Sequence, residues 1–265
     1  MRSKKTNRPA SRIALSLSGL AVLVVLWAVA IRLSPGTLLP GPAAVLRAIV
    51  EIAQKGFLVK HVVASLFRVT WGYLLAVAIG VPLGIFLGRL RRPEMAIAPL
   101  IEFLRPISPL AWIPIAILWF GVGDLAAVFI IFLASLLPIT LTAMNAVGSV
   151  ALVHWNAGLN FGLSPAELAR KVIAPAILPQ LIVGLRLTLG IAWLVVVAAE
   201  MIAVNSGLGF LIIDARNAGN RYDVVVAGMV LIGLIGVGLD VAMRRLERLK
   251  AASWGYESAV EGVAA

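Results

Sequence analysis

The feature that most constrains this chain is a set of long apolar stretches without any charged side chain. Leu125–Ala166 is uncharged for 42 residues, Val69–Gly88 for 20 and Ile13–Ile31 for 19. A helix needs about 20 mostly apolar residues to cross a membrane. Charged residues make up 13% of the chain, against about 25% in a soluble domain. The runs lack the alternation of a β-barrel, so the sequence predicts an all-α membrane protein.

The hydropathy pattern predicts about six transmembrane helices. They are expected at residues 13–31, 69–88, 106–123, 125–147, 182–204 and 224–243. The transmembrane domain would therefore cover residues 13–250, between a basic segment at 1–12 and a tail at 251–265. A cleaved secretory signal is the alternative for the N-terminus, because Ala28-Val29-Ala30 offers a small-residue site. The nearly spanning length of the first run favours an uncleaved helix.

The excess of basic residues predicts the orientation of these helices. The chain has 23 Lys and Arg residues against 12 Asp and Glu, a net charge of +11. If Met1 is cytoplasmic, 15 of the 23 basic residues lie in cytoplasmic segments and seven in outer segments. Basic residues prefer the cytoplasmic side, so both termini are predicted to lie there. The charge then has an explanation that needs no nucleic-acid partner.

The first outer segment contains an amphipathic pattern. Val45, Ile49 and Ile52 recur at helical spacing, with charged residues on the other face. Residues 43–55 are therefore predicted to form a helix that lies along the membrane surface.

Three glycines of the second predicted span form a stripe. Gly80, Gly84 and Gly88 recur every four residues, which lets another helix approach closely. Packing within one subunit is the favoured interpretation, and a subunit or pathway contact is the alternative.

A helix start is encoded in the predicted cytoplasmic loop, residues 151–180. Ser164 can cap a helix, Glu167 can reach back to the cap, and Pro165 suits the first helical position. Pro175 should end this helix after about ten residues. It carries an apolar edge and basic residues, so it is expected either to seek a groove on a partner or to be a plain loop helix.

Two ionisable residues interrupt the fifth predicted span. Arg186 lies near its cytoplasmic end and Glu200 near its outer end, 14 positions apart or about 21 Å along a helix. They cannot pair within one straight helix. Glu200 is expected to line a pathway, to bind another helix or to reach outer water, because charges at membrane depth are costly.

Sequence motifs for catalysis and for cofactors are missing. The chain has no cysteine, two histidines and no G-x-x-x-x-G-K-[ST] phosphate loop. No nucleophile motif or metal-binding motif is present either. The chain is therefore expected to be neither an enzyme nor a metalloprotein, and any energy would come from a partner or a gradient.

The loop sequence Asn156-Ala157-Gly158-Leu159-Asn160-Phe161-Gly162, followed by Pro175 and Pro179, resembles the cytoplasmic loop of binding-protein-dependent ABC importer permeases. Gly162 matches the family's glycine, whereas Asn156-Ala157-Gly158 replaces its Glu-Ala-Ala. Further segments resemble the nitrate/sulfonate/taurine branch of the family, in the same order along the chain. These are residues 105–114, 118–121, 184–186, 198–200, 205–209 and 222–226.

The resemblance implies a permease subunit with a type I-like fold in the bacterial inner membrane. Two ATPase subunits would bind the ATP, a second permease copy would complete the pathway, and a periplasmic or lipid-anchored binding protein would deliver the solute. The helix from Ser164 would be the coupling helix that contacts the ATPase. The residues assigned to this contact are Gly162, Leu163, Ser164, Pro165, Ala166, Glu167, Leu168 and Arg170.

The resemblance also suggests the solute. The branch handles taurine, alkanesulfonates and nitrate, and relatives carry thiamine precursors, so a small anion or organic sulfonate is expected and another small organic solute is the alternative. Arg186 and Glu200 are the pathway candidates. A gradient-driven carrier or channel is a different possibility, but it would need ionisable groups at mid-membrane rather than near the span ends.

Overall fold

The computed structural model describes residues 9–33, 38–89, 99–100, 103–104 and 106–253, which contain helices and no strand. The helices are α1 (Pro9–Leu33), α2 (Pro42–Gln54), α3 (Phe57–Gly88), η1 (Pro109–Trp112), α5 (Ile113–Phe120), α6 (Asp124–Gly148), α7 (Leu152–Asn160), α8 (Pro165–Leu168), η2 (Ala169–Ile173), α9 (Ala174–Ala203), α10 (Leu208–Gly219) and α11 (Tyr222–Ser253). The prediction of an all-α protein is confirmed. Most of the predicted basic segment and most of the predicted tail lie outside the described residues.

The chain divides into two compact units. One unit comprises residues 1–59 and 211–230, and the other comprises residues 60–210 and 231–265. The second unit holds α6, α9 and the loop between them, together with most of α3. The features that bear on function are described within each unit.

Four of the described helices are long and apolar enough to cross a membrane. They cover Phe57–Gly88, Asp124–Gly148, Pro165–Ala203 and Tyr222–Glu247. Each covers one of the predicted spans, except that Val204, the last residue of the predicted span 182–204, lies just after the helix that ends at Ala203. The first predicted span falls within α1, whose described apolar part is Ala21–Leu33. The count of six spans stays a prediction.

The third predicted span contains a shorter helix, Pro109–Phe120, than the 18 residues predicted. A four-residue 3-10 helix, η1, leads into the eight-residue helix α5. The Ser108 side chain accepts a hydrogen bond from the Leu110 amide and so starts a helix there, and Gly121 ends α5 with a φ of +75°. Twelve helical residues rise about 20 Å, which is less than the roughly 30 Å of a bilayer core. The prediction of one 18-residue helix was therefore wrong.

The helix that starts at Ser164 does not end at Pro175, in contrast to the prediction. It continues through the π-helical turn η2 into α9, up to Ala203. A proline ring inside an α-helix collides with the carbonyl four residues earlier, which here is the carbonyl of Lys171. Lys171 lies within the wider π-helical turn, where the hydrogen-bond spacing is longer. The turn therefore accommodates the proline and lets the helix continue.

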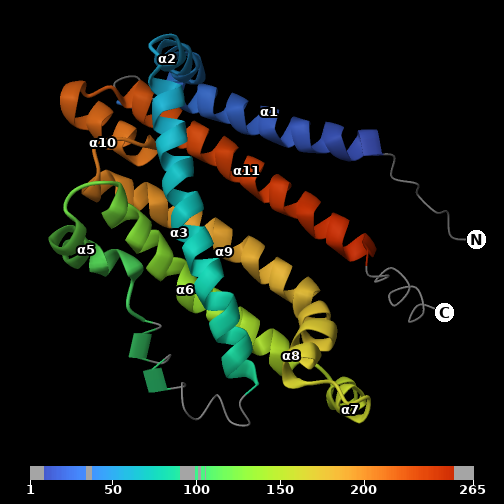
Figure 1. Cartoon of the computed structure of the whole chain (residues 1–265). Coiled ribbons are helices and arrows are strands. Elements are labelled where there is room, and N and C mark those ends of the chain that lie inside the picture. Colours follow the sequence, from blue (N-terminus) through green and yellow to red (C-terminus); the bar gives the residue numbers. More distant parts are fainter. Residues whose placement is uncertain (1–8, 34–37, 90–98, 101–102, 105, 254–265) are drawn as a thin grey trace, which may run out of the picture. The chain divides into compact units, whose positions relative to one another are not determined.

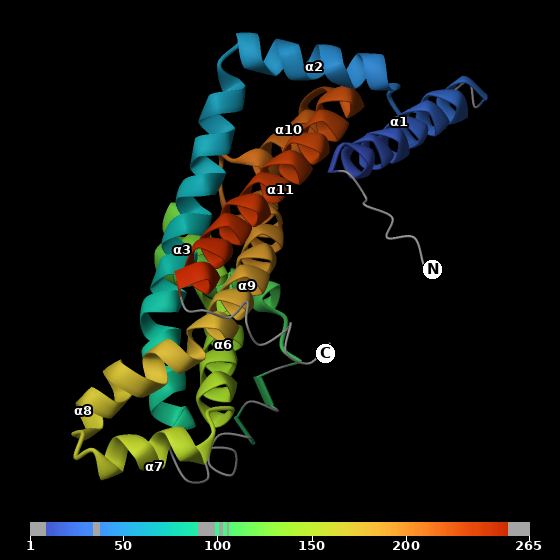
Figure 2. The same cartoon turned by 90° about the vertical axis from the view of Figure 1, so that its right-hand side faces the viewer.

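The core of the second unit is built from α3, α6 and α9. The glycine stripe of α3 lies against α6: a Cβ atom at Gly80 would be 3.0 Å from Ile139 Cγ2, and one at Gly88 would be 2.7 Å from Val147 Cβ. At Gly84 it would overlap the carbonyl oxygen of Thr140. Helix α9 runs beside α6 in both views (Figures 1 and 2). The stripe thus permits close helix packing within one subunit.

The first unit contains the predicted amphipathic helix as α2. Its buried side chains are Val45, Ala48 and Ile52. On its opposite face, Glu51 accepts hydrogen bonds from Lys55 at 2.6 Å and from Arg221 at 2.7 Å. These two bonds lower the pKa of the Glu51 carboxyl from 4.5 to about 2, with Arg221 as the main cause. The Arg221 contact ties α2 to the turn before α11.

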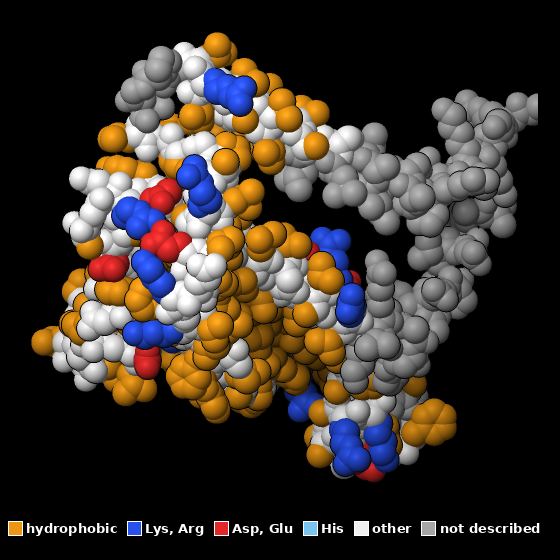
Figure 3. Space-filling view, turned by 90° about the horizontal axis from the view of Figure 1, so that it is seen from above, with side chains coloured by type: hydrophobic (Ala, Val, Ile, Leu, Met, Phe, Trp, Pro, Cys, Tyr) orange, Lys and Arg blue, Asp and Glu red, His pale blue; other side chains and the backbone are white. Residues whose placement is uncertain are grey.

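Much of the described surface is apolar. Large hydrophobic side chains such as Leu118, Leu194 and Leu234 are more than 60% exposed. In Figure 3, hydrophobic side chains cover much of the visible face, and charged side chains gather in separate small groups. Such a surface suits contact with lipid or with other membrane subunits.

We expect Gly84→Ala to destabilise the protein by about 1–3 kcal/mol, because the added methyl group would push α6 away from α3. Gly190→Ala is the matched control, since a Cβ atom at this helical glycine has no neighbour within 4 Å. Thermal unfolding in detergent measures both variants. Equal melting temperatures for the two variants would contradict the assigned α3–α6 contact.

We expect Glu51→Gln to lower the melting temperature in a pH-dependent way. A depressed folded-state pKa means that the carboxylate contributes its full stabilisation above pH 4.5 and loses it as the pH falls toward about 2. The difference in melting temperature between wild type and variant should be constant above pH 5 and shrink below pH 4.5. A difference that grows on acidification would exclude the ion pair as its source.

Candidate functional site

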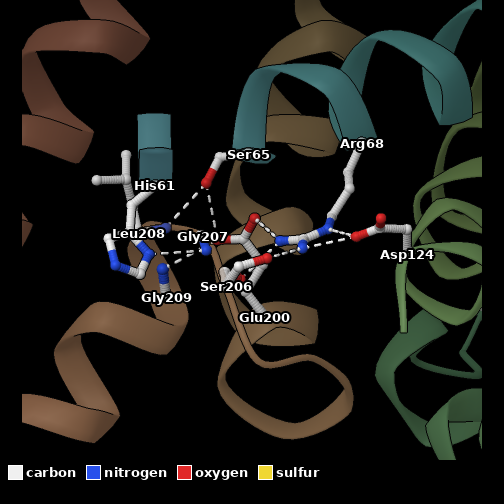
Figure 4. A network of polar contacts seen from close by, with 9 residues as sticks. All are labelled: His61, Ser65, Arg68, Asp124, Glu200, Ser206, Gly207, Leu208 and Gly209. Atoms are coloured by element: carbon white, nitrogen blue, oxygen red, sulfur yellow. Dashed lines mark hydrogen bonds and ion pairs between the residues drawn. The ribbon is translucent and has the colours of Figure 1, made fainter. Parts of the chain in front are cut away.

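Arg68 lies at the centre of a polar network in the second unit (Figure 4). It belongs to α3 and is 1% exposed. Its Nε donates to Asp124 at 2.8 Å, its Nη1 donates to Glu200 at 2.8 Å and to the Ser206 carbonyl at 2.7 Å, and its Nη2 donates to the Ser206 hydroxyl. Nη2 also lies 2.7 Å from the Asp124 carboxylate. All three guanidinium nitrogens therefore have oxygen partners, which uses the planar fork that only arginine offers.

Glu200 is the buried anion of this network. It belongs to α9 and is fully buried. Its Oε1 accepts from Arg68, and its Oε2 accepts from the Ser65 hydroxyl and the Gly209 amide, both at 2.9 Å. A buried carboxylate is tolerated when it is paired and its oxygens are hydrogen-bonded. Three interpretations were left open for Glu200. The structure shows the contact with another helix, α3.

The turn between α9 and α10 packs against the side chains of Arg68 and Glu200. The Gly207 amide donates to His61 Nδ1 at 3.0 Å, and the Leu208 amide donates to Ser65 Oγ at 2.9 Å. Gly207 has a φ of +104°, and a Cβ atom there would overlap the Glu200 carboxylate. The turn therefore needs glycine for its conformation and for space. We use the term Arg68 network for the residues Arg68, Glu200, Asp124, Ser65, Ser206, His61 and the backbone of 207–209.

Asp124 is the exposed edge of the Arg68 network. Its side chain is 59% exposed and lies in the first turn of α6, where a carboxylate interacts favourably with the helix dipole. One residue earlier, the Gly123 amide donates to the Ala203 carbonyl at 2.9 Å. The start of α6 is thus bound both to α3 and to the end of α9.

Sequence reasoning missed Arg68 because it placed residue 68 in an outer segment before the second span. Helix α3 begins at Phe57, so Arg68 lies well inside it. The missed signal is the spacing of His61, Ser65 and Arg68, which places three polar side chains on one face of a helix.

The loop between α6 and α9 is the second candidate site. The predicted cap at Ser164 forms: Ser164 Oγ accepts from the Glu167 amide at 3.3 Å, and the Glu167 carboxylate accepts from the Ser164 amide at 3.1 Å. Lys171 adds an ion pair to Glu167 at 2.8 Å. Gly162, with a φ of +71°, makes the turn between α7 and the cap. Residues 152–173 thus form two short helical arms, and we call them the coupling loop after the role that was predicted for them.

The residues assigned to ATPase contact occupy different depths in the coupling loop. Gly162, Ser164, Pro165, Ala166 and Arg170 are exposed, and Leu163 and Glu167 are half-buried. Leu168 is buried with Ile173 and the end of α6, and its Cδ1 fills the space that a side chain at Gly158 would need. Leu168 therefore supports the loop from inside and does not form its surface.

The most exposed large hydrophobic residue of the coupling loop had no assigned role. Phe161 is 86% exposed, beside Gly162. Leu152, Val153 and Leu159 of α7 are also more than half exposed. An exposed aromatic residue among aliphatic ones is typical of a protein–protein contact.

Arg186 also forms ion pairs with carboxylates. Its Nε donates to Asp240 at 2.7 Å and its Nη1 donates to Glu247 at 3.1 Å, both on α11. Arg244 binds the second oxygen of Asp240 at 2.8 Å. The structure thus keeps Arg186 and Glu200 in separate clusters, each with partners of opposite charge.

Comparison with known proteins places these features in a family. Residues 80–251 match the family described as binding-protein-dependent transport system inner membrane component. The chain is 40% identical to a putative ABC transporter permease protein of Methanocaldococcus jannaschii, over 92% of this chain and 93% of that one. It is 37% identical to the taurine transport system permease protein TauC of Escherichia coli, over 93% and 92%. It is 32% identical to the putative aliphatic sulfonates transport permease protein SsuC of Bacillus subtilis, over 86% and 83%.

A solved structure supports the fold. A chain from the MetNI methionine ABC transporter in inward-facing conformations superposes with a TM-score of 0.66. The match covers 73% of this chain and 96% of that chain, at 21% sequence identity. The likeness at this identity concerns the fold alone.

We expect Gly158→Ala to loosen the coupling loop, because the new methyl group would displace Leu168 at a cost of about 1–3 kcal/mol. Hydrogen exchange of residues 152–173 should become faster. The double variant Gly158→Ala/Leu168→Val removes the Cδ1 atom that the alanine meets, so it should restore slow exchange in part. Unchanged exchange in the single variant would exclude this packing.

Proposed function

This chain belongs to the family of binding-protein-dependent transport system inner membrane components, and we propose that it is the permease subunit of an ATP-driven importer for a small anionic solute. Permease subunits of this family are not themselves catalytic. The proposal depends mainly on the coupling loop. This loop is packed against the helix core and exposes an apolar surface, and the chain has no nucleotide-binding motif of its own.

The coupling loop is suited to contact an ATPase subunit. Phe161 offers an exposed aromatic anchor, and Arg170 and Lys171 supply exposed positive charge on the following arm. The cap at Ser164 and the buried Leu168 hold Arg170 and Lys171 near the start of a continuous helix, and Phe161 lies in the turn before it. A force on this surface would therefore act on α9 directly.

The remaining partners follow from the same proposal. Two ATPase subunits would bind and hydrolyse ATP, and a second permease copy would complete the pathway in the inner membrane. A periplasmic or lipid-anchored binding protein would deliver the solute. ATP binding would draw the ATPases together, and the permease would alternate between its two accessible states.

An organic sulfonate such as taurine is the proposed solute class. Two relatives are named for taurine and for aliphatic sulfonates. In this chain Arg186 and Glu200, the two pathway candidates, are both bound by side chains of opposite charge. Neither is free to select a solute, so the binding protein would supply most of the selectivity. Thiamine-precursor-like solutes are the alternative.

The proposal is tested with the complex of permease, ATPase and binding protein reconstituted in liposomes. We expect ATP-dependent uptake of labelled taurine or ethanesulfonate and no uptake without ATP. Uptake of a thiamine precursor in place of sulfonates would support the alternative solute. Uptake by this chain alone, driven by an ion gradient, would overturn the proposal.

We expect Phe161→Glu to abolish this uptake and the binding of the ATPase, because it puts a charge into the proposed contact. Phe161→Leu is the matched control and should retain most activity, since it keeps an apolar side chain. The side chain is 86% exposed, so neither change should affect folding. ATPase co-purification with the Glu variant at the wild-type level would exclude Phe161 from the contact.

A further inference from the structure

Helices α3, α6 and α9 are joined along their length. The glycine stripe fixes α3 to α6, as described above. The Tyr73 hydroxyl of α3 donates to the Leu185 carbonyl of α9 at 2.8 Å. Between α6 and α9, Thr142 occupies the space that a side chain at Gly184 would need. The steric contacts of α6 with α3 and with α9 therefore leave little room for sliding, and a hydrogen bond joins α3 to α9.

One end of these three helices is fixed to the coupling loop. Leu168 and Ile173 of the loop are buried in one cluster with Ala146 and Val147, the last turns of α6. Ile85 of α3 packs against the same cluster. The coupling loop is thus part of the helix core, and a displacement of the loop has to move the ends of α6 and α3.

The other end is fixed by the Arg68 network. Arg68 of α3 binds Glu200 at the end of α9 and Asp124 at the start of α6. Removal of one member of the buried pair would leave the other as an uncompensated charge, which strongly disfavours opening. The network also holds the turn at 206–209, so the start of α10 is attached to the same point.

The Arg68 network does not fit a solute-binding role. The guanidinium nitrogens of Arg68 all have partners, and Glu200 accepts from three donors while being fully buried. A solute would have to displace these internal partners. The arrangement fits a mechanical role, because it joins three helices at the end opposite to the coupling loop.

We propose that Arg68 and Glu200 are positioning residues for transport: they lock α3, α6 and α9 into one body, so that a displacement of the coupling loop reaches the turn between α9 and α10 undiminished. This inference rests on the proposed importer function. It predicts that loss of the network lowers the amount of solute transported per ATP hydrolysed. The ATPase contact stays intact, so hydrolysis continues, but the more loosely packed helices no longer transmit the full displacement of the coupling loop.

The first test measures solute uptake and ATP hydrolysis in the same proteoliposomes. Glu200→Gln removes the buried negative charge, and Arg68→Lys keeps the positive charge but loses the planar fork. We expect the ratio of solute transported to ATP hydrolysed to fall at least about fivefold in both variants. Lys55→Gln, which removes an exposed ion pair on α2, is the control and should keep the wild-type ratio. A wild-type ratio in Glu200→Gln would overturn the inference.

The second test leaves the network intact and therefore does not depend on the folding of its variants. The chain has no cysteine, so cysteines introduced at the exposed Val122 and Asn160 carry the only spin labels. In complexes diluted with unlabelled permease, we expect the distance between the labels of one chain to be the same with and without ATP. A change in that distance would show that the body is not rigid and would overturn the inference.

A third measurement separates failure of this inference from failure of the proposed function. The distance between Asn160 labels on the two permease copies should change with ATP, which shows that the transport cycle takes place. No uptake and no change between the copies would refute the importer function itself. A change between the copies together with a change within one chain would refute only the rigid body.

Discussion

The ion pair between Arg68 and Glu200 is the interaction on which the arrangement of the second unit depends. Both side chains are buried, and 132 positions separate them in the sequence. A buried carboxylate requires a hydrogen-bond donor for each of its oxygens, and a buried guanidinium requires an acceptor for each of its three nitrogens. The pair therefore dictates where α3, α6, α9 and the turn after α9 must meet.

The two polar clusters on α9 show why position along a helix changes what a charge does. Glu200 is sealed by a glycine-rich turn and by the hydroxyl of Ser65. Arg186 is 23% exposed and shares the Asp240 carboxylate with Arg244. An exposed ion pair contributes little and rearranges easily, whereas a buried one is costly to open. The helix thus has a fixed contact at one end and a more adaptable one nearer the coupling loop.

Local patterns predicted local structure well. The apolar runs predicted the long helices, the pattern at 43–55 predicted α2, and Ser164 with Glu167 predicted a cap that forms. The predicted end at Pro175 was wrong because a π-helical turn, whose last residue Ile173 is buried, accommodates the proline. The predicted length of the third helix was wrong because hydropathy does not register the helix start that Ser108 creates.

Contacts between distant segments could not be predicted in the same way. A single sequence shows that Glu200 is charged, but it does not show that Ser65 and Arg68 face it from another helix. The helical spacing of His61, Ser65 and Arg68 is visible only once α3 is known to begin before them. The surface of the coupling loop was likewise hidden, because the depth of Leu168 is set by its neighbours on α6 and α7.

The contact between Gly158 and Leu168 restricts which residue types can occupy these two positions together. The third position of the family's Glu-Ala-Ala pattern is glycine here, and Leu168 occupies the volume that an alanine methyl would take. The two positions share one space, so a change at either alters which residues the other tolerates. Among related permeases, positions 158 and 168 should therefore co-vary: those with alanine at the first should carry a smaller or differently shaped residue at the second.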